Sequence, residues 1–161
     1  MDNIIIFIKR MKKKDIIKNS SYLITQKYKS LKENKERILY SGVVLDDHSK
    51  NNLISYVEEF VDIPMSWNSL GDHMTIIFKE ELPPELKKDL NKEVKLIVKK
   101  IGISDDAIAV EVEGYPTTKD IPHITVAIPP DGKPVNSNYI EDWEEVNDPL
   151  ILNGKVTEVR Y

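Results

Sequence analysis

Between residues 38 and 161 the chain alternates apolar and polar positions in short runs, the pattern of strands that are buried on one face. Two of these runs are close enough in sequence to pair as a hairpin across Ser104-Asp105-Asp106. The last run contains Asn153-Gly154, where we expect a bulge or a turn. The strands predicted in this way cover residues 38–45, 73–78, 94–101, 107–112, 121–128 and 150–161.

The segment from residue 47 to residue 60 instead has apolar residues at helical spacing. Asp47 or Ser49 can cap this helix by accepting a hydrogen bond from a free amide, and Pro64 is well placed to end it. The apolar stripe that we expect to face the core is formed by Leu53, Ile54, Val57 and Phe60 or Val61.

Two shorter helices are predicted, over residues 85–90 and from Ser137 or Asn138 to Trp143. The order of elements is then strand–helix–strand, followed by three strands, a helix and a strand. This order predicts an α+β domain with mostly antiparallel sheets and flanking helices.

The composition fits one soluble globular domain, since 40% of the 161 residues are hydrophobic and 31% are charged. The chain has no cysteine, which excludes disulfides, cysteine-ligated zinc and thiol catalysis, and fits a reducing intracellular location, cytoplasmic or nuclear. The apolar run at residues 4–8 is far too short to span a bilayer. We therefore expect a monomer that does not associate with a membrane.

Charge divides the chain near residue 37. Residues 1–37 carry 11 Lys and Arg against 4 Asp and Glu, whereas residues 38–161 carry 12 against 23. We expect a domain at 38–161 preceded by a basic extension, with weak helical spacing at Ile16, Ile17, Leu23 and Ile24. The extension could pack on the domain, bind RNA or a partner, or lie on a membrane surface. The acidic domain suits a small substrate or the end of a strand better than a long nucleic acid.

One four-residue pattern occurs twice within predicted strands, as His73-Met74-Thr75-Ile76 and as His123-Ile124-Thr125-Val126. Because side chains alternate along a strand, each copy presents an imidazole and a hydroxyl on one face, roughly 6–7 Å apart. Two copies that face each other would line a cleft with two histidines and two threonines.

These motifs resemble the signature of the 2H phosphoesterase superfamily, the LigT-like fold. Their surroundings are similar to the Swiss army knife RNA-repair branch and to the phosphodiesterase domain of fungal and plant tRNA ligases. The resemblance covers residues 38–161 and implies a bilobal domain with a central cleft. The matching segments are residues 71–76, 122–127, 132–134, 137–138, 143 and 152–156.

The resemblance implies a metal-independent phosphodiesterase that acts on RNA-derived cyclic phosphate, with a 2′,3′-cyclic end as the expected substrate, without a cofactor. His73 and His123 would be the general acid and base, in an order that the sequence leaves open, and Thr75 and Thr125 would hold the phosphate. Three alternatives remain: hydrolysis of a free cyclic nucleotide or oligonucleotide, 2′–5′ RNA ligation, and an RNA-end binding module without catalysis.

Four further residues are candidates for substrate binding. Trp67 and Tyr115 precede the motif strands and could stack on a base or pack on the core. Lys133 could contact phosphate or remain a solvated turn lysine, and Ser137 could cap a helix near the site. His48 is expected on the surface. A chain with three histidines and no cysteine predicts no zinc site.

Overall fold

The structure, a computed structural model, describes residues 20–27 and 37–161, and the chain divides into two units between Arg37 and Ile38. In the first unit, residues 20–27 form an α-helix in which the Thr25 hydroxyl donates to the Ser21 carbonyl. Tyr22, Leu23 and Ile24 on this helix are exposed. The predicted apolar positions at residues 16 and 17 lie outside the described residues.

The second unit contains strands, one α-helix and two 3₁₀ helices, in an order close to the predicted one. Within the described parts of the chain, no helix is long and apolar enough to cross a membrane. The elements are β1 (Ile38–Leu45), α3 (Asp47–Glu58), β2 (Asn68–Ser69), β3 (His73–Phe78), η1 (Pro84–Asp89), β4 (Glu93–Ile103), β5 (Ile108–Glu113), β6 (His123–Ile128), η2 (Pro134–Tyr139), β7 (Asp142–Glu145) and β8 (Ile151–Arg160).

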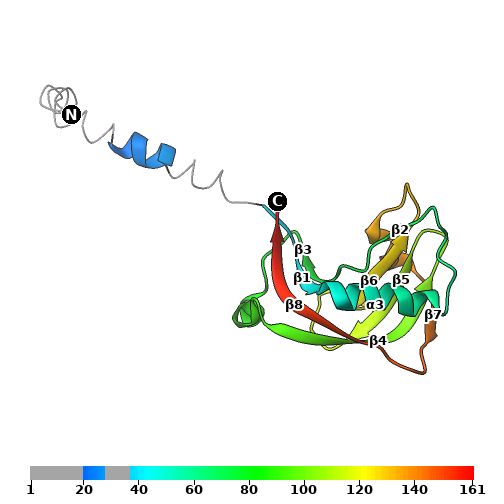
Figure 1. Cartoon of the computed structure of the whole chain (residues 1–161). Helices are drawn as coiled ribbons and strands as arrows, with labels where there is room; N and C mark the ends of the chain where they lie inside the picture. The colour runs from blue at the N-terminus through cyan, green and yellow to red at the C-terminus, as the bar shows by residue number, and fades with distance from the viewer. Residues whose placement is uncertain (1–19, 28–36) are drawn as a thin grey trace, which may run out of the picture. The chain divides into compact units, whose positions relative to one another are not determined.

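The strands form one antiparallel sheet that closes on itself (Figure 1). Neighbours run in the order β6, β3, β1, β8, β4 and β5, and the pairing of β5 with β6 completes a six-stranded barrel. The short strands β2 and β7 pair with β6 and β4. The α+β class with antiparallel pairing is therefore confirmed.

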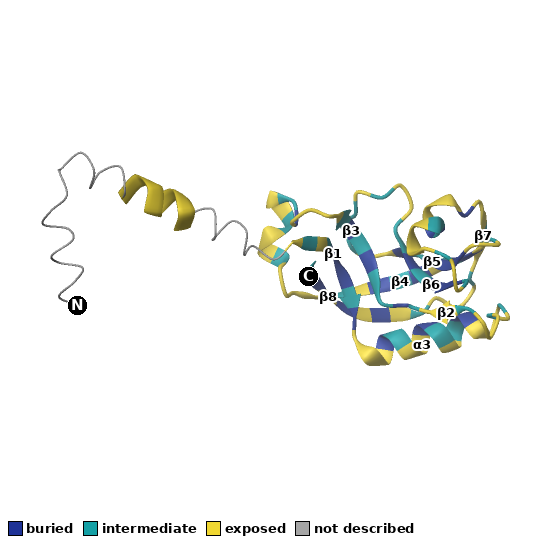
Figure 2. Cartoon of the chain, turned by 90° about the horizontal axis from the view of Figure 1, so that it is seen from above, coloured by how far each residue is buried: buried dark blue, intermediate teal, exposed yellow. Residues whose placement is uncertain are grey.

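The core lies inside this barrel and under α3, where apolar side chains at alternate strand positions are shielded from water. Figure 2 shows that buried residues are concentrated on the strands, whereas α3 alternates between buried and exposed residues. Leu53 and Val57 of α3 join the same apolar cluster. Fully buried strand residues in this cluster are Val43, Met74, Ile76, Leu96, Val98, Val110, Ile124, Val126, Leu152 and Val156.

The start of α3 differs from the prediction. The helix is capped by Asp46, whose carboxylate accepts a hydrogen bond of 2.7 Å from the Ser49 amide. Ser49 is buried instead, and its hydroxyl accepts a bond from the Asn153 amide on β8. Because Asp46, Asp47 and Ser49 are all good caps, the sequence did not distinguish among them.

The C-terminal third also differs in two places. Trp143 lies on β7 and not on a helix, because its indole ring covers Gly102 of the paired strand β4, where a Cβ atom would meet the ring at 2.6 Å. The strand β8 shows no register shift at Asn153-Gly154. Gly154 is needed there because a Cβ atom would lie 2.6 Å from Val43 Cγ1.

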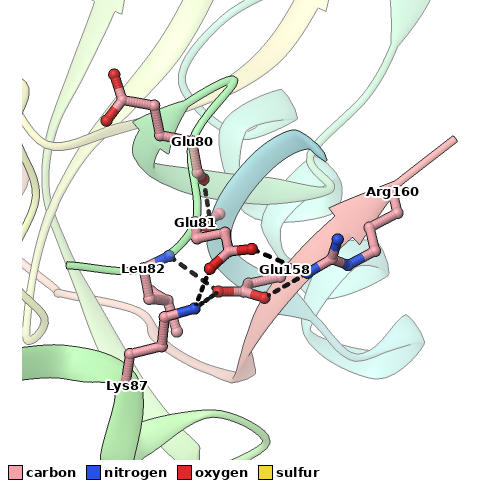
Figure 3. Close-up of polar contacts among 7 residues, drawn as sticks. Glu80, Glu81, Leu82, Lys87, Glu158 and Arg160 are labelled. Atoms are coloured by element: carbon pink, nitrogen blue, oxygen red, sulfur yellow. Dashed lines mark hydrogen bonds and ion pairs between the residues drawn. The ribbon is translucent and has the colours of Figure 1, made fainter. Parts of the chain in front are cut away.

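A cluster of charged side chains joins the end of β8 to the segment before η1 (Figure 3). The Glu158 carboxylate is almost fully buried and accepts bonds from the Leu82 amide, the Lys87 ammonium and the Arg160 guanidinium, each at 3.0 Å. Lys87 also contacts Glu81. Burial alone would raise the pKa of Glu158, but these hydrogen bonds hold it below its ordinary value.

Candidate active site

The register of β3 against β6 brings the two motifs together. Met74 lies opposite Ile124 in this antiparallel pair. In the neighbouring positions His73 therefore lies opposite Thr125, and Thr75 lies opposite His123. Each motif is thereby related to the other by a local quasi-two-fold axis through the central pair. The inward side chains Met74 and Ile124 are fully buried, which fixes the register.

The link between β2 and β3 holds β3 along the same edge of β6. The amides of Leu70 and Gly71 donate to the carbonyls of Val126 and Thr125, at 2.7 and 2.9 Å. Gly71 has a φ of 72°, a conformation that favours glycine. The Gly-Asp pair before the first motif therefore delivers His73 to its place beside the second.

All four predicted motif side chains line one cavity of about 230 Å³. The floor comes from β3 and β6, and the walls come from the chain before β6 and from η2. The remaining lining residues are Leu70, Asp72, Phe78, Lys119, Pro134, Val135 and Asn138.

His123 is held by its own backbone. Its Nδ1 lies 2.8 Å from the Ile121 carbonyl oxygen, and because a carbonyl only accepts, Nδ1 carries the proton. In the neutral ring the lone pair is therefore on Nε2. Burial lowers the pKa of His123, the bond to Ile121 opposes this, and the positive charge of Lys119 lowers it further.

His73 is held by stacking. The Tyr40 ring lies 4.0 Å from the imidazole, with 14° between the planes. Gly42 leaves room for that ring, because a Cβ atom there would lie 3.2 Å from Tyr40 Cδ2 and 2.6 Å from the Met74 carbonyl. His73 Nδ1 is buried and has no hydrogen-bond partner within the described residues. Burial lowers the pKa of His73, Asp72 raises it, and His123 lowers it.

The two threonines differ in their partners. The Thr125 hydroxyl lies 2.9 Å from the Ser137 hydroxyl and donates weakly to the Pro134 carbonyl at 3.3 Å. Ser137 is only 1% exposed, so it contacts Thr125 from the buried side and holds its hydroxyl in place. The Thr75 hydroxyl makes no hydrogen bond with another described residue, which leaves it available to a ligand.

Of the four predicted substrate-binding residues, one lies at the site and three do not. Ser137 touches Thr125, as described, but Trp67, Tyr115 and Lys133 do not line the cavity. Trp67 packs on the core, and the Tyr115 hydroxyl donates to Asp89 at 3.0 Å. Burial, and to a smaller extent this hydrogen bond, raise the pKa of Tyr115 to about 12.

In a regular strand Phe78 would share the buried face of Met74 and Ile76, but it is 55% exposed and lines the cavity. The pairing of β1 with β3 shifts register between Ser41 and Gly42, whose partners are Ile77 and Thr75. This bulge reverses the alternation after Ile76 and turns Phe78 to the side of Thr75. No pattern in the sequence of β3 marks the bulge.

Other residues of the site that were not predicted include Tyr40, Asp72 and Lys119. Asp72 pairs with Lys50 of α3 and lies next to the first motif, which was the available signal for it. Tyr40 reaches the site only through the pairing of β1 with β3. His48 is exposed and contacts Asn52, as expected of a surface histidine.

Among the residues that the structure describes, no three His, Asp or Glu side chains gather in a way that could hold a metal ion. Comparison with models of known protein families gives no match, and comparison with curated protein sequences gives none either.

Proposed function

We propose that this chain is a phosphodiesterase that hydrolyses RNA-derived cyclic phosphate, a 2′,3′-cyclic phosphate end, with His123 as general base and His73 as general acid. The observation that carries this proposal is that both motif histidines and both motif threonines line one cavity. Burial lowers the pKa of both histidines, but the charge of Lys119 lowers that of His123 further, whereas the charge of Asp72 partly offsets burial at His73. Neighbours of opposite sign separate the two histidines into a base and an acid.

His123 is suited to the role of base. Because its Nδ1 donates to the Ile121 carbonyl, the unprotonated Nε2 can take a proton from water. The water oxygen then attacks phosphorus, and one bond between phosphorus and a ribose oxygen breaks. The bond to Ile121 also stabilises the imidazolium that forms, since Nδ1 remains a donor.

His73 is suited to the role of acid, in its protonated form, and donates a proton to the departing ribose oxygen. Burial lowers the pKa of His73, and the negative charges of Asp72 and of a bound phosphate oppose this effect and favour the protonated form. The stacked ring of Tyr40 holds the plane of this imidazole. The Thr75 hydroxyl can donate to a non-bridging phosphate oxygen, and the Thr125 hydroxyl can do so in exchange for its weak bond to Pro134.

The rim of the cavity fits a nucleoside. Phe78 offers an exposed aromatic face on which a base could stack, and Leu70 and Val135 add apolar surface. A nucleoside phosphate is therefore a better candidate ligand than a phosphate that carries no base.

The proposal includes kinship with the 2H phosphoesterases. The two lobes of that family would correspond to the halves of the barrel that carry β3 and β6, with the cavity between them. The local quasi-two-fold relation of the motifs supports this correspondence. The mechanism proposed for the motifs needs no metal.

The test is incubation with an RNA that ends in a 2′,3′-cyclic phosphate, followed by analysis of the products. We expect conversion to a 2′- or 3′-monophosphate end. Binding without turnover would support the RNA-end binding module instead. Joining of the cyclic end to a 5′-hydroxyl would identify a ligase.

A further inference from the structure

A second hollow, of about 360 Å³, adjoins the cavity and shares lining residues with it. The two share the side chains of Lys119, His123 and Asn138, but no residue of β3 lines the second one. Its other lining residues are Thr118, Asp120, Ile121 and Ser137. A ligand that fills the cavity can therefore continue past His123 into this hollow.

The segment that carries Lys119 is anchored to β3. The Thr117 hydroxyl donates to the Thr75 carbonyl at 2.7 Å and accepts a bond from the Lys119 amide at 3.1 Å. The Thr118 amide donates to the Ile76 carbonyl at 2.9 Å. These bonds fix the backbone of Lys119 relative to the motif residue Thr75, and Lys119 lines both the cavity and the second hollow.

The hollow offers two donors to a ligand. The hydroxyls of Thr118 and Ser137 are already bonded to Ile76 and to Thr125. The Lys119 ammonium and the Asn138 amide make no side-chain hydrogen bond within the described parts of the chain. A cation and a neutral donor beside a phosphoryl site fit a second anionic oxygen group.

We infer that the second hollow binds the phosphodiester group next to the reacting cyclic phosphate, so that the substrate is the end of an RNA strand and not a mononucleotide. This inference rests on the proposed function. Lys119 donates to the phosphodiester as a cation, and Asn138 donates from the opposite wall. Asp120 lines the same hollow and opposes the binding of an anion there.

The experiment compares kcat/KM for two substrates with the same terminal base, a dinucleotide and a mononucleoside, both ending in a 2′,3′-cyclic phosphate. The wild-type chain should prefer the dinucleotide by at least about tenfold, the order expected of one charge-assisted hydrogen bond. Lys119→Gln should remove most of this preference, and Asp120→Asn should keep or increase it. Lys88→Gln, at an exposed lysine of η1 outside both hollows, should leave it unchanged.

The ratio of the two substrates is the readout, because any effect of Lys119 on the pKa of His123 changes both rates and cancels. The preference should also shrink as salt rises in the wild-type chain but not in Lys119→Gln. Equal rates for the two substrates in the wild-type chain, or an equal loss of both in Lys119→Gln, would overturn the inference. Turnover of neither substrate would overturn the proposed function itself.

Discussion

At the scale of single residues, the two motif histidines differ in how their ring planes are held. His123 has a hydrogen bond to the Ile121 carbonyl, whereas the His73 ring stacks on Tyr40 and its Nδ1 has no hydrogen-bond partner among the described residues. Tyr40 reaches His73 across Gly42, the position where a side chain would interfere. We therefore interpret Tyr40 as a positioning residue for the proposed acid.

Replacing Tyr40 tests this role. A stacked aromatic pair contributes about 0.5–1.5 kcal/mol, so Tyr40→Ala should lower kcat by up to about tenfold with little change in KM. Tyr40→Phe keeps the ring and should stay near the wild-type rate. Loss of the ring also hydrates His73 and so raises its pKa, which should move the alkaline limb of the pH–rate profile to higher pH. If Tyr40→Phe were as slow as Tyr40→Ala, stacking would not be the reason.

The motif residues of the site could be predicted because they lie in contiguous four-residue patterns. The alternation of a strand placed each His and Thr on one face, and the structure brings all four to one cavity. Tyr40 and Phe78 could not be predicted in the same way. The place of Tyr40 depends on a neighbouring strand, and that of Phe78 on a bulge.

At the scale of elements, the charged cluster around Glu158 fastens β8 to the segment before η1. This carboxylate is 7% exposed and is the acceptor for a backbone amide and two cationic side chains. No periodic pattern in the sequence marks this contact, because Leu82 and Lys87 lie more than 70 residues from Glu158 along the chain.

Glu158→Gln should reduce the free energy of unfolding by about 1–3 kcal/mol at neutral pH, because Lys87 and Arg160 lose a charged acceptor. The folded-state pKa of Glu158 is lowered, so the unfolded chain binds a proton more readily. The contribution is therefore complete above the ordinary Glu value near 4.3 and is lost as pH falls through the lowered pKa.

Denaturant unfolding of the wild-type chain and of Glu158→Gln at several pH values measures this contribution. The difference between the two should be largest near pH 7 and should disappear in acid. Glu113→Gln is a matched control, since that carboxylate is exposed and contacts Lys99 at 3.6 Å. A difference that stayed constant with pH would show that the charge of Glu158 does not stabilise the fold.

The long strands of the sheet were easier to predict than the short strand β7. Residues 38–45 and 73–78 form β1 and β3 as predicted, whereas Trp143 was assigned to a helix and lies on β7. The apolar alternation is visible in the sequence, but the strand partner of Trp143 is not, since Gly102 is distant along the chain.

At the scale of the whole second unit, closure of the barrel is what places two distant motifs side by side. The pairing of β6 with both β3 and β5 joins the two halves of the sheet. The sequence predicted α+β antiparallel strands but not their order, because strand order depends on contacts between segments that local periodicity does not encode.

The proposed function also follows from this arrangement, since neither motif alone offers both an acid and a base. Residues that act as a unit in one reaction show losses that do not add. Each single substitution, His73→Ala or His123→Ala, should therefore remove most of the activity that the pair provides. The double variant should be little worse than the slower single variant.

The most direct measurement is the rate of hydrolysis of an RNA 2′,3′-cyclic phosphate by the wild-type chain, His73→Ala and His123→Ala, each with a chelator present and each shown to be folded by circular dichroism. We predict that the wild-type rate persists in the chelator and that each variant is slower by at least about 10²-fold. Near-native turnover in either variant, or activity that chelator removes and one metal ion restores, would contradict a mechanism based on two histidines.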